Sequence, residues 1–122
     1  MRYIPDAKYS GYPCSYVGTG CAYEDQTGKE FDQPLPEALR SDGYLSLDAE
    51  NKYIRSVLPV KKKQYFKRGE RPILKAWLAQ NKYPCCICVY GHFIYAKGED
   101  YWSFFDNDDD EIVCIWYLKE SA

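Results

Sequence analysis

The stretch PCCICVYGHFIYAKGEDYWSFF, residues 84–105, decides how this chain folds. Residues 85–90 form a continuous apolar run rich in Cys, Ile and Val, which predicts a buried strand. Residues 93–96 predict a second strand, and the turn signal Gly98-Glu99-Asp100 separates it from an aromatic strand at 101–105. Strands that follow one another through such short turns form an antiparallel meander.

Two further segments extend this sheet. The acidic run at 106–111 predicts a solvated turn, and residues 112–118 predict a last strand. The basic segment 61–67 predicts an exposed strand whose lysines protect a sheet edge. The acidic run does not match a calcium-binding EF-hand loop, because its sixth position is Glu111 rather than Gly.

The chain before the meander has the apolar spacing and stop signals of helices. Helices first and sheet second is the α+β pattern. We therefore expect a single α+β domain over residues 1–122, with N-terminal helices packed on a C-terminal antiparallel sheet. Helices are expected at residues 14–24, 35–41 and 71–80, and from Ser46 or Asp48 to about Leu58.

Composition restricts the classes of function. The chain has 122 residues, 46% of them hydrophobic, and a formal net charge of −2, which disfavours nucleic acid as a partner. No stretch approaches the roughly 20 apolar residues of a membrane span, and the N-terminus lacks the apolar region of a signal peptide. We expect a cytoplasmic protein without a membrane partner, whose six cysteines are thiols.

Three residues form a candidate catalytic set. Cys14 lies where a helix begins, so the helix dipole would favour its thiolate. His92 is the only histidine of the chain and is the candidate base. Asp106 ends the strand after that of His92, and the turn near Gly98 lies midway between the two. Antiparallel pairing would then allow the carboxylate to orient the imidazole, with Asn107 as the alternative.

This order of residues resembles the papain-like cysteine peptidase superfamily, and most closely its small bacterial and phage-type, C39-like members. The resemblance rests on PCSYV at 13–17, YGHFIYAKG at 90–98 and FDN at 105–107, and it covers roughly residues 9–118. It implies a papain-like fold and a hydrolase that acts on a peptide or protein substrate without a cofactor. In that mechanism the Cys14 thiol attacks a peptide-type carbonyl.

The chain departs from the family at two positions. Members usually carry Gln about six residues before the nucleophile, where this chain has Lys8, and C39 members carry Gly after it, where this chain has Ser15. The backbone N–H of Cys14 with Tyr9 or Ser10 would then form the oxyanion hole. We expect the substrate groove to contain Tyr9, Ser10, Ser15 and Asn107. A catalytically inert member that binds a peptide or protein is the alternative.

A structural zinc site is a further alternative. Cys85, Cys88 and His92 have the spacing C-x2-C-x3-H, which Cys14 and Cys21 would complete. An odd separation on a strand places Cys85 and Cys88 on opposite faces, however, so the prediction names no metal ligand. The basic run 61–68 also contains aromatic residues that would suit single-stranded nucleic acid, but an edge strand is the preferred interpretation.

Overall fold

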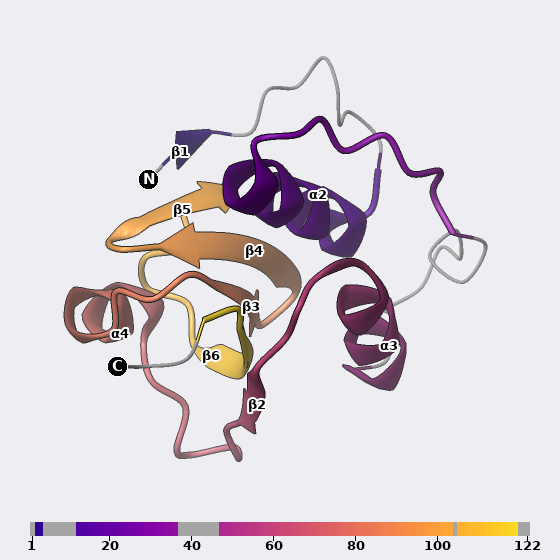
Figure 1. The fold of residues 1–122 in the computed structure, drawn as a ribbon. Coiled ribbons are helices and arrows are strands. Elements are labelled where there is room, and N and C mark those ends of the chain that lie inside the picture. Colours follow the sequence, from indigo (N-terminus) through magenta and orange to yellow (C-terminus); the bar gives the residue numbers. More distant parts are fainter. Residues whose placement is uncertain (1, 4–11, 37–46, 104, 120–122) are drawn as a thin grey trace.

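The computed structural model describes residues 2–3, 12–36, 47–103 and 105–119 of the chain. Within these residues three helices surround one six-stranded sheet (Figure 1). The α+β class predicted from the sequence is confirmed. The helices are α2 (Cys14–Thr27), α3 (Leu47–Val57) and α4 (Leu74–Gln80), and the strands are β1 (Arg2–Tyr3), β2 (Lys62–Tyr65), β3 (Cys85–Val89), β4 (His92–Lys97), β5 (Asp100–Ser103) and β6 (Ile112–Tyr117).

The strands lie in the order β1-β5-β4-β3-β6-β2. All pairs are antiparallel except β1 with β5, which is parallel. The predicted meander corresponds to β3, β4 and β5, and β6 returns to pair with β3 on its other side. The predicted basic strand is β2, which lies at the edge beside β6 and confirms the expected exposed position.

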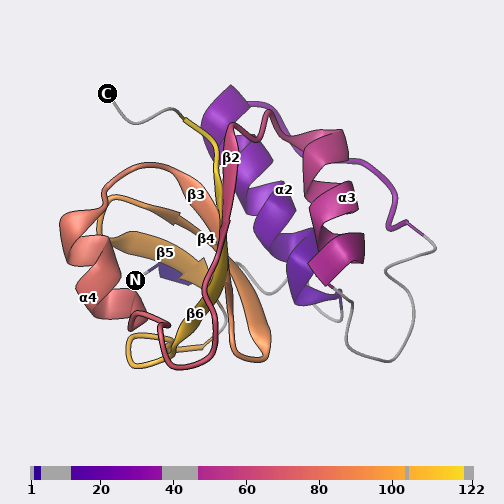
Figure 2. The same ribbon diagram turned by 90° about the horizontal axis from the view of Figure 1, so that it is seen from below.

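The helices pack on the sheet, as expected, and they cover both of its faces. Figure 2 shows α2 and α3 side by side on one face and α4 on the other. The first face buries Cys86, Tyr95 and Trp116 against the two helices. The second face buries Ile87 and Ile115 against α4. The apolar run of β3 is continuous because both of its faces are covered.

Close packing fixes α2 on the sheet. A Cβ added to Gly18 would lie 2.5 Å from Cδ1 of Phe93, so only glycine leaves room for that ring. The helix follows Pro13 and is capped after Thr27 by Gly28, whose positive φ of 71° allows its N–H to reach the Glu24 carbonyl at 2.9 Å. It therefore continues three residues beyond the predicted end at Glu24.

The other helices differ from their predicted bounds for local reasons. The helix α4 begins at Leu74 because Pro72 and Ile73 join the sheet instead: Ile112 donates to the Pro72 carbonyl, and Ile73 bridges to Glu111. The helix α3 agrees with its prediction to within one residue. The helix predicted at 35–41 lies largely outside the described residues, and Leu35 and Pro36 are not helical.

A polar network joins the C-terminal half of α2 to β4. The Tyr95 hydroxyl donates to Oδ2 of Asp25 at 2.6 Å and accepts from Nε2 of Gln26 at 2.8 Å. Asp25 also contacts the Lys97 ammonium at 3.3 Å. The ring of Tyr95 is fully buried, so these bonds satisfy a hydroxyl at the end of a core side chain.

Replacing Tyr95 with phenylalanine should therefore lower the free energy of unfolding by about 1–2 kcal/mol, because Asp25 and Gln26 each lose a partner. Urea denaturation measures the change. Tyr90→Phe is the matched control, since the Tyr90 side chain is 79% exposed and should give a change near zero. Equal stability of Tyr95→Phe and the wild type would contradict a structural role for the network.

Within the described residues, no helix is long and apolar enough to cross a membrane.

Candidate functional site

The candidate nucleophile Cys14 is the first residue of α2 and is half-buried. Burial raises the pKa of its thiol, while hydrogen bonds from the backbone N–H groups of Phe93 and Ser15 and from its own N–H lower it. The charge of Glu50 raises this pKa further. The thiol thus lies where the helix N-terminus meets the start of β4, yet burial keeps it protonated.

The candidate base His92 is the first residue of β4 and follows the Tyr90-Gly91 turn. It pairs with Val89, while its neighbour Phe93 pairs with Cys88. Val89 belongs to the face that α4 covers, and Phe93 belongs to the face that α2 covers. Because directly paired residues share a face, the His92 side chain lies on the α4 face. Its ring contacts Phe105, with 5.0 Å between centroids.

Cys14 and His92 consequently meet at one end of β4 but from opposite faces of the sheet. The thiol reaches the N–H of Phe93, the residue directly after His92. Its pKa is shifted by Glu50, whereas His92 is not among the groups that act on it within the described residues. In this conformation the two side chains do not form the thiolate–imidazolium pair of an activated nucleophile.

The candidate orienting residue Asp106 is exposed and bonded elsewhere. Its Oδ1 accepts from the Tyr101 hydroxyl at 3.3 Å and from the N–H of Asp108 at 3.0 Å. The register of β4 with β5, in which Tyr95 pairs with Trp102, extends to place Phe105 rather than Asp106 opposite His92. Within the described residues, Asp106 makes no hydrogen bond to His92.

The alternative orienting residue Asn107 is buried inside the turn that follows β5. Its amide accepts from Oγ of Ser103 at 2.6 Å and donates to Asp110 at 2.7 Å, and its N–H donates to the Tyr101 hydroxyl at 2.9 Å. These bonds hold the turn together and leave the amide occupied. Asn107 therefore supports the turn in this structure rather than the surface of a groove.

The other predicted groove residues lie near the start of α2. Tyr9 and Ser10 fall outside the described residues. Ser15 is buried, and its Oγ has no hydrogen-bond partner within the described structure. Tyr12 is 44% exposed, and its ring lies 5.1 Å from that of Tyr16.

Glu50 belongs to this site and was not predicted from the sequence. Its side chain is buried on the inner face of α3, and its Oε2 has no hydrogen-bond partner among the described groups. Burial is the main cause that raises the pKa values of Cys14, Cys88 and Cys114, which come from α2, β3 and β6, and the charge of Glu50 raises each of them further. Burial raises the pKa of Glu50 itself to about 7. The helical spacing from Glu50 to Ile54 was the signal that this carboxyl faces the core.

The cysteines considered for zinc lie on both faces of the sheet. Cys85 packs on the α4 face and Cys88 on the α2 face, as their odd separation predicts. In the part of the chain that the structure describes, no group of three or more His, Cys, Asp or Glu side chains is arranged to hold a metal ion.

Comparison with known proteins adds no relative. No protein-family model matches the chain, and no curated protein and no solved structure shows significant similarity to it.

Proposed function

We propose that this protein is a small papain-like thiol hydrolase that acts on a peptide-type carbonyl, with Cys14 as the nucleophile, His92 as the base and Asp106 as the orienting residue. The observation that supports the proposal best is the position of the Cys14 thiol. It lies at the N-terminus of α2 and accepts the N–H of Phe93, next to His92.

The chemistry needs few groups. The Cys14 sulfur bonds to the carbonyl carbon, and its proton passes to His92, which later protonates the leaving amine. The backbone N–H groups of Phe93 and Cys14 already point at the sulfur and favour negative charge there. Water then releases the acyl group and regenerates the thiol.

The proposal requires His92 to move. Its imidazole has to pass from the α4 face to the α2 face, beside Cys14. The residue lies at the start of β4, next to Gly91 with its φ of 84°, and its half-buried ring contacts that of Phe105. Substrate binding would stabilise the rearranged hairpin.

A second candidate function is supported by the same geometry. The separation of Cys14 from His92, together with the raised pKa of the thiol, favours a non-catalytic protein that binds a peptide or a partner protein. In this second proposal Cys14 is a packing residue at the start of α2.

Thiol labelling distinguishes the two candidates. If the protein is a hydrolase, a peptidyl epoxide should label Cys14 faster in the folded protein than in the protein unfolded in urea. Intact-protein and peptide mass spectrometry measure the two rates. His92→Gln should slow this labelling roughly 100-fold, as expected for loss of a base. Cys21→Ser is the matched control because Cys21 is a buried thiol on the same helix.

Two results would count against the hydrolase. In the first, Cys14 is labelled no faster in the folded than in the unfolded protein, and the rate is the same in the wild type and in His92→Gln. The binding protein would then be the better proposal. A labelling rate that falls equally in Cys21→Ser and His92→Gln would show that both act by loosening the fold. Circular dichroism of each variant checks that it is folded.

A further inference from the structure

Among the described residues, no strand pairs with the outer edge of β2. This strand contacts β6 on one side and lies last in the sheet order. Its flanking residues also bond inward: the N–H of Lys61 donates to the Tyr117 carbonyl at 2.8 Å, and that of Phe66 donates to Val113 at 2.9 Å. The outward backbone groups between them have no backbone partner within the described chain. Such an edge can accept another strand.

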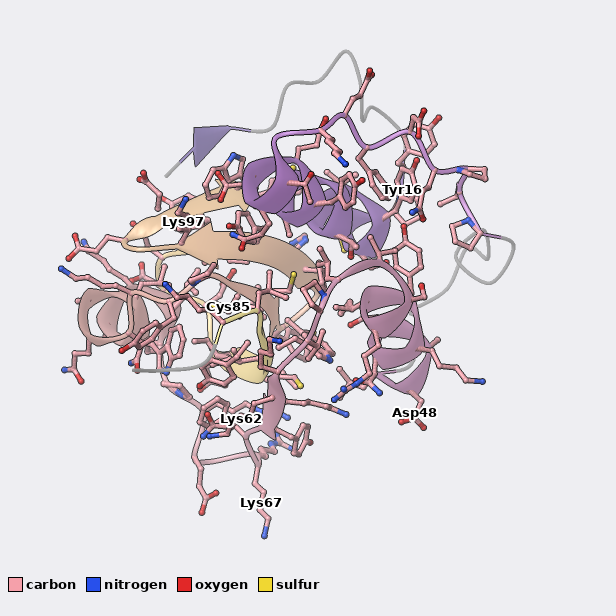
Figure 3. All side chains as sticks on the ribbon, in the orientation of Figure 1. Tyr16, Asp48, Lys62, Lys67, Cys85 and Lys97 are labelled. Carbon is pink, nitrogen blue, oxygen red and sulfur yellow. The ribbon has the colours of Figure 1, made fainter. Side chains whose placement is uncertain are left out.

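The same edge is strongly basic in an acidic chain. Five cationic side chains lie on or beside β2, and none of them makes an ion pair within the described residues. The whole chain, by contrast, has sixteen basic and eighteen acidic residues. Figure 3 shows the Lys67 side chain extending away from the fold below β2. Four of the cations are exposed and Lys63 is half-buried; the five are Lys61, Lys62, Lys63, Lys67 and Arg68.

Aromatic side chains lie between these cations. Tyr65, the last residue of β2, is 52% exposed. The Lys62 ammonium lies over the ring of Tyr117, 5.5 Å from its centroid, and the Tyr117 hydroxyl donates to Gln64 at 2.7 Å. These contacts hold the edge in a defined shape, with Tyr65 free to cover an apolar side chain of a partner.

We infer that the β2 edge binds an acidic peptide segment in extended conformation, which adds to the sheet as a seventh strand. Backbone hydrogen bonds along β2 supply affinity, and the five cations select carboxylates. Lysines on an edge usually prevent pairing between copies of one protein, because each copy brings the same charge. A strand rich in Glu or Asp turns this repulsion into attraction.

Extended peptide fits these observations better than nucleic acid does. A peptide supplies the N–H and C=O groups that an open strand edge lacks, whereas phosphates satisfy only its donors. This inference is independent of whether Cys14 is a nucleophile, since β2 and α2 lie at different parts of the molecule (Figure 1).

The test uses a fluorescein-labelled peptide of alternating Glu and Val, with binding measured by fluorescence anisotropy at low salt. The double variant Lys62→Glu/Lys67→Glu should weaken binding at least about tenfold, because both changes reverse charge at the edge. The matched control Lys52→Glu/Lys75→Glu makes the same change in net charge on exposed positions of α3 and α4, and should bind as the wild type does.

A second peptide tests strand addition itself. The same sequence is made in two versions, with N-methyl groups on one or the other set of alternate residues. Each version keeps every carboxylate but cannot form backbone hydrogen bonds along one of its edges. One of the two versions should bind at least about tenfold more weakly than the unmethylated peptide. Equal binding of methylated and unmethylated peptides in both versions would overturn strand addition. So would equal losses in the two double variants.

Two other occupants would also be detected. The wild type would bind a twelve-nucleotide oligothymidylate more tightly than the peptide, and Lys62→Glu/Lys67→Glu would lose this binding, if the edge served nucleic acid. That result would overturn the inference. A wild-type dimer in sedimentation velocity that the same variant converts to monomer would overturn it in favour of a second copy of the chain.

Discussion

Replacing Glu50 with glutamine is expected to remove a loss of stability that the wild-type protein suffers as the pH rises from about 4.5 to about 7. The Glu50 side chain is only 9% exposed, and burial raises its pKa from 4.5 to about 7. Its protonated form is therefore the one that the folded protein prefers.

The sign follows from the order of the two pKa values. Between them, the unfolded chain releases the Glu50 proton while the folded protein keeps it, so rising pH favours unfolding. The stabilisation is fully present below pH 4.5 and is lost once the pH passes about 7. The difference between the pKa of Glu50 in the unfolded and in the folded protein corresponds to at most about 3 kcal/mol in the free energy of unfolding.

The measurement is the free energy of unfolding by urea at pH 4.5, 6 and 8, for the wild type and Glu50→Gln. Between pH 4.5 and pH 8, the free energy of unfolding of Glu50→Gln should rise by about 2–3 kcal/mol relative to that of the wild type. Other carboxylates act equally on both proteins and cancel. Asp48→Asn on the exposed side of α3 is the control and should show a much smaller shift. A constant difference for Glu50→Gln would contradict the buried position.

The same substitution bears on the candidate nucleophile. Since the Glu50 charge raises the pKa of Cys14, glutamine should increase the fraction of thiolate at Cys14 above pH 7. Faster labelling of Cys14 in Glu50→Gln at pH 8, with equal rates at pH 5, would link the two groups in solution.

The sheet could be predicted because its signals are local. The apolar run at 85–90 and the turn signal at Gly98-Glu99-Asp100 specify β3, β4 and β5 within a few residues. The pairing of β1 with β5 joins residues about one hundred positions apart and has no local signal. The continuous apolar run of β3 requires a layer on each face of the sheet, but the sequence does not say which helix supplies the second layer.

The candidate site was harder to predict because one residue of register decides it. The turn after β4 consists of two residues, and β5 resumes at Asp100, so Phe105 rather than Asp106 comes opposite His92. Likewise, because His92 pairs with Val89, its imidazole lies on the α4 face of the sheet. Phe93 then lies on the opposite face, which is the face of Cys14. A shift of a single residue exchanges the two faces of a strand.

Gly18→Val should be among the most destabilising single substitutions on α2, with a loss of about 3 kcal/mol. An added Cβ would lie 2.5 Å and 2.8 Å from two ring carbons of Phe93 and 3.5 Å from the carbonyl carbon of Ile94. The Phe93 ring cannot easily withdraw, because it is buried and lies 5.6 Å from the ring of Trp116. Overpacking of this kind typically costs 1–3 kcal/mol, and valine brings two methyl groups beyond the Cβ.

A double-mutant cycle shows whether the Phe93 ring is the cause. Phe93→Leu removes the ring carbons that the new Cβ meets, so the double variant Gly18→Val/Phe93→Leu should be more stable than the sum of the single losses predicts, by at least about 1 kcal/mol. Lys52→Val places the same side chain at an exposed position of α3 and should cost less than about 1 kcal/mol. Strict additivity in the cycle would contradict the close contact between Gly18 and the Phe93 ring.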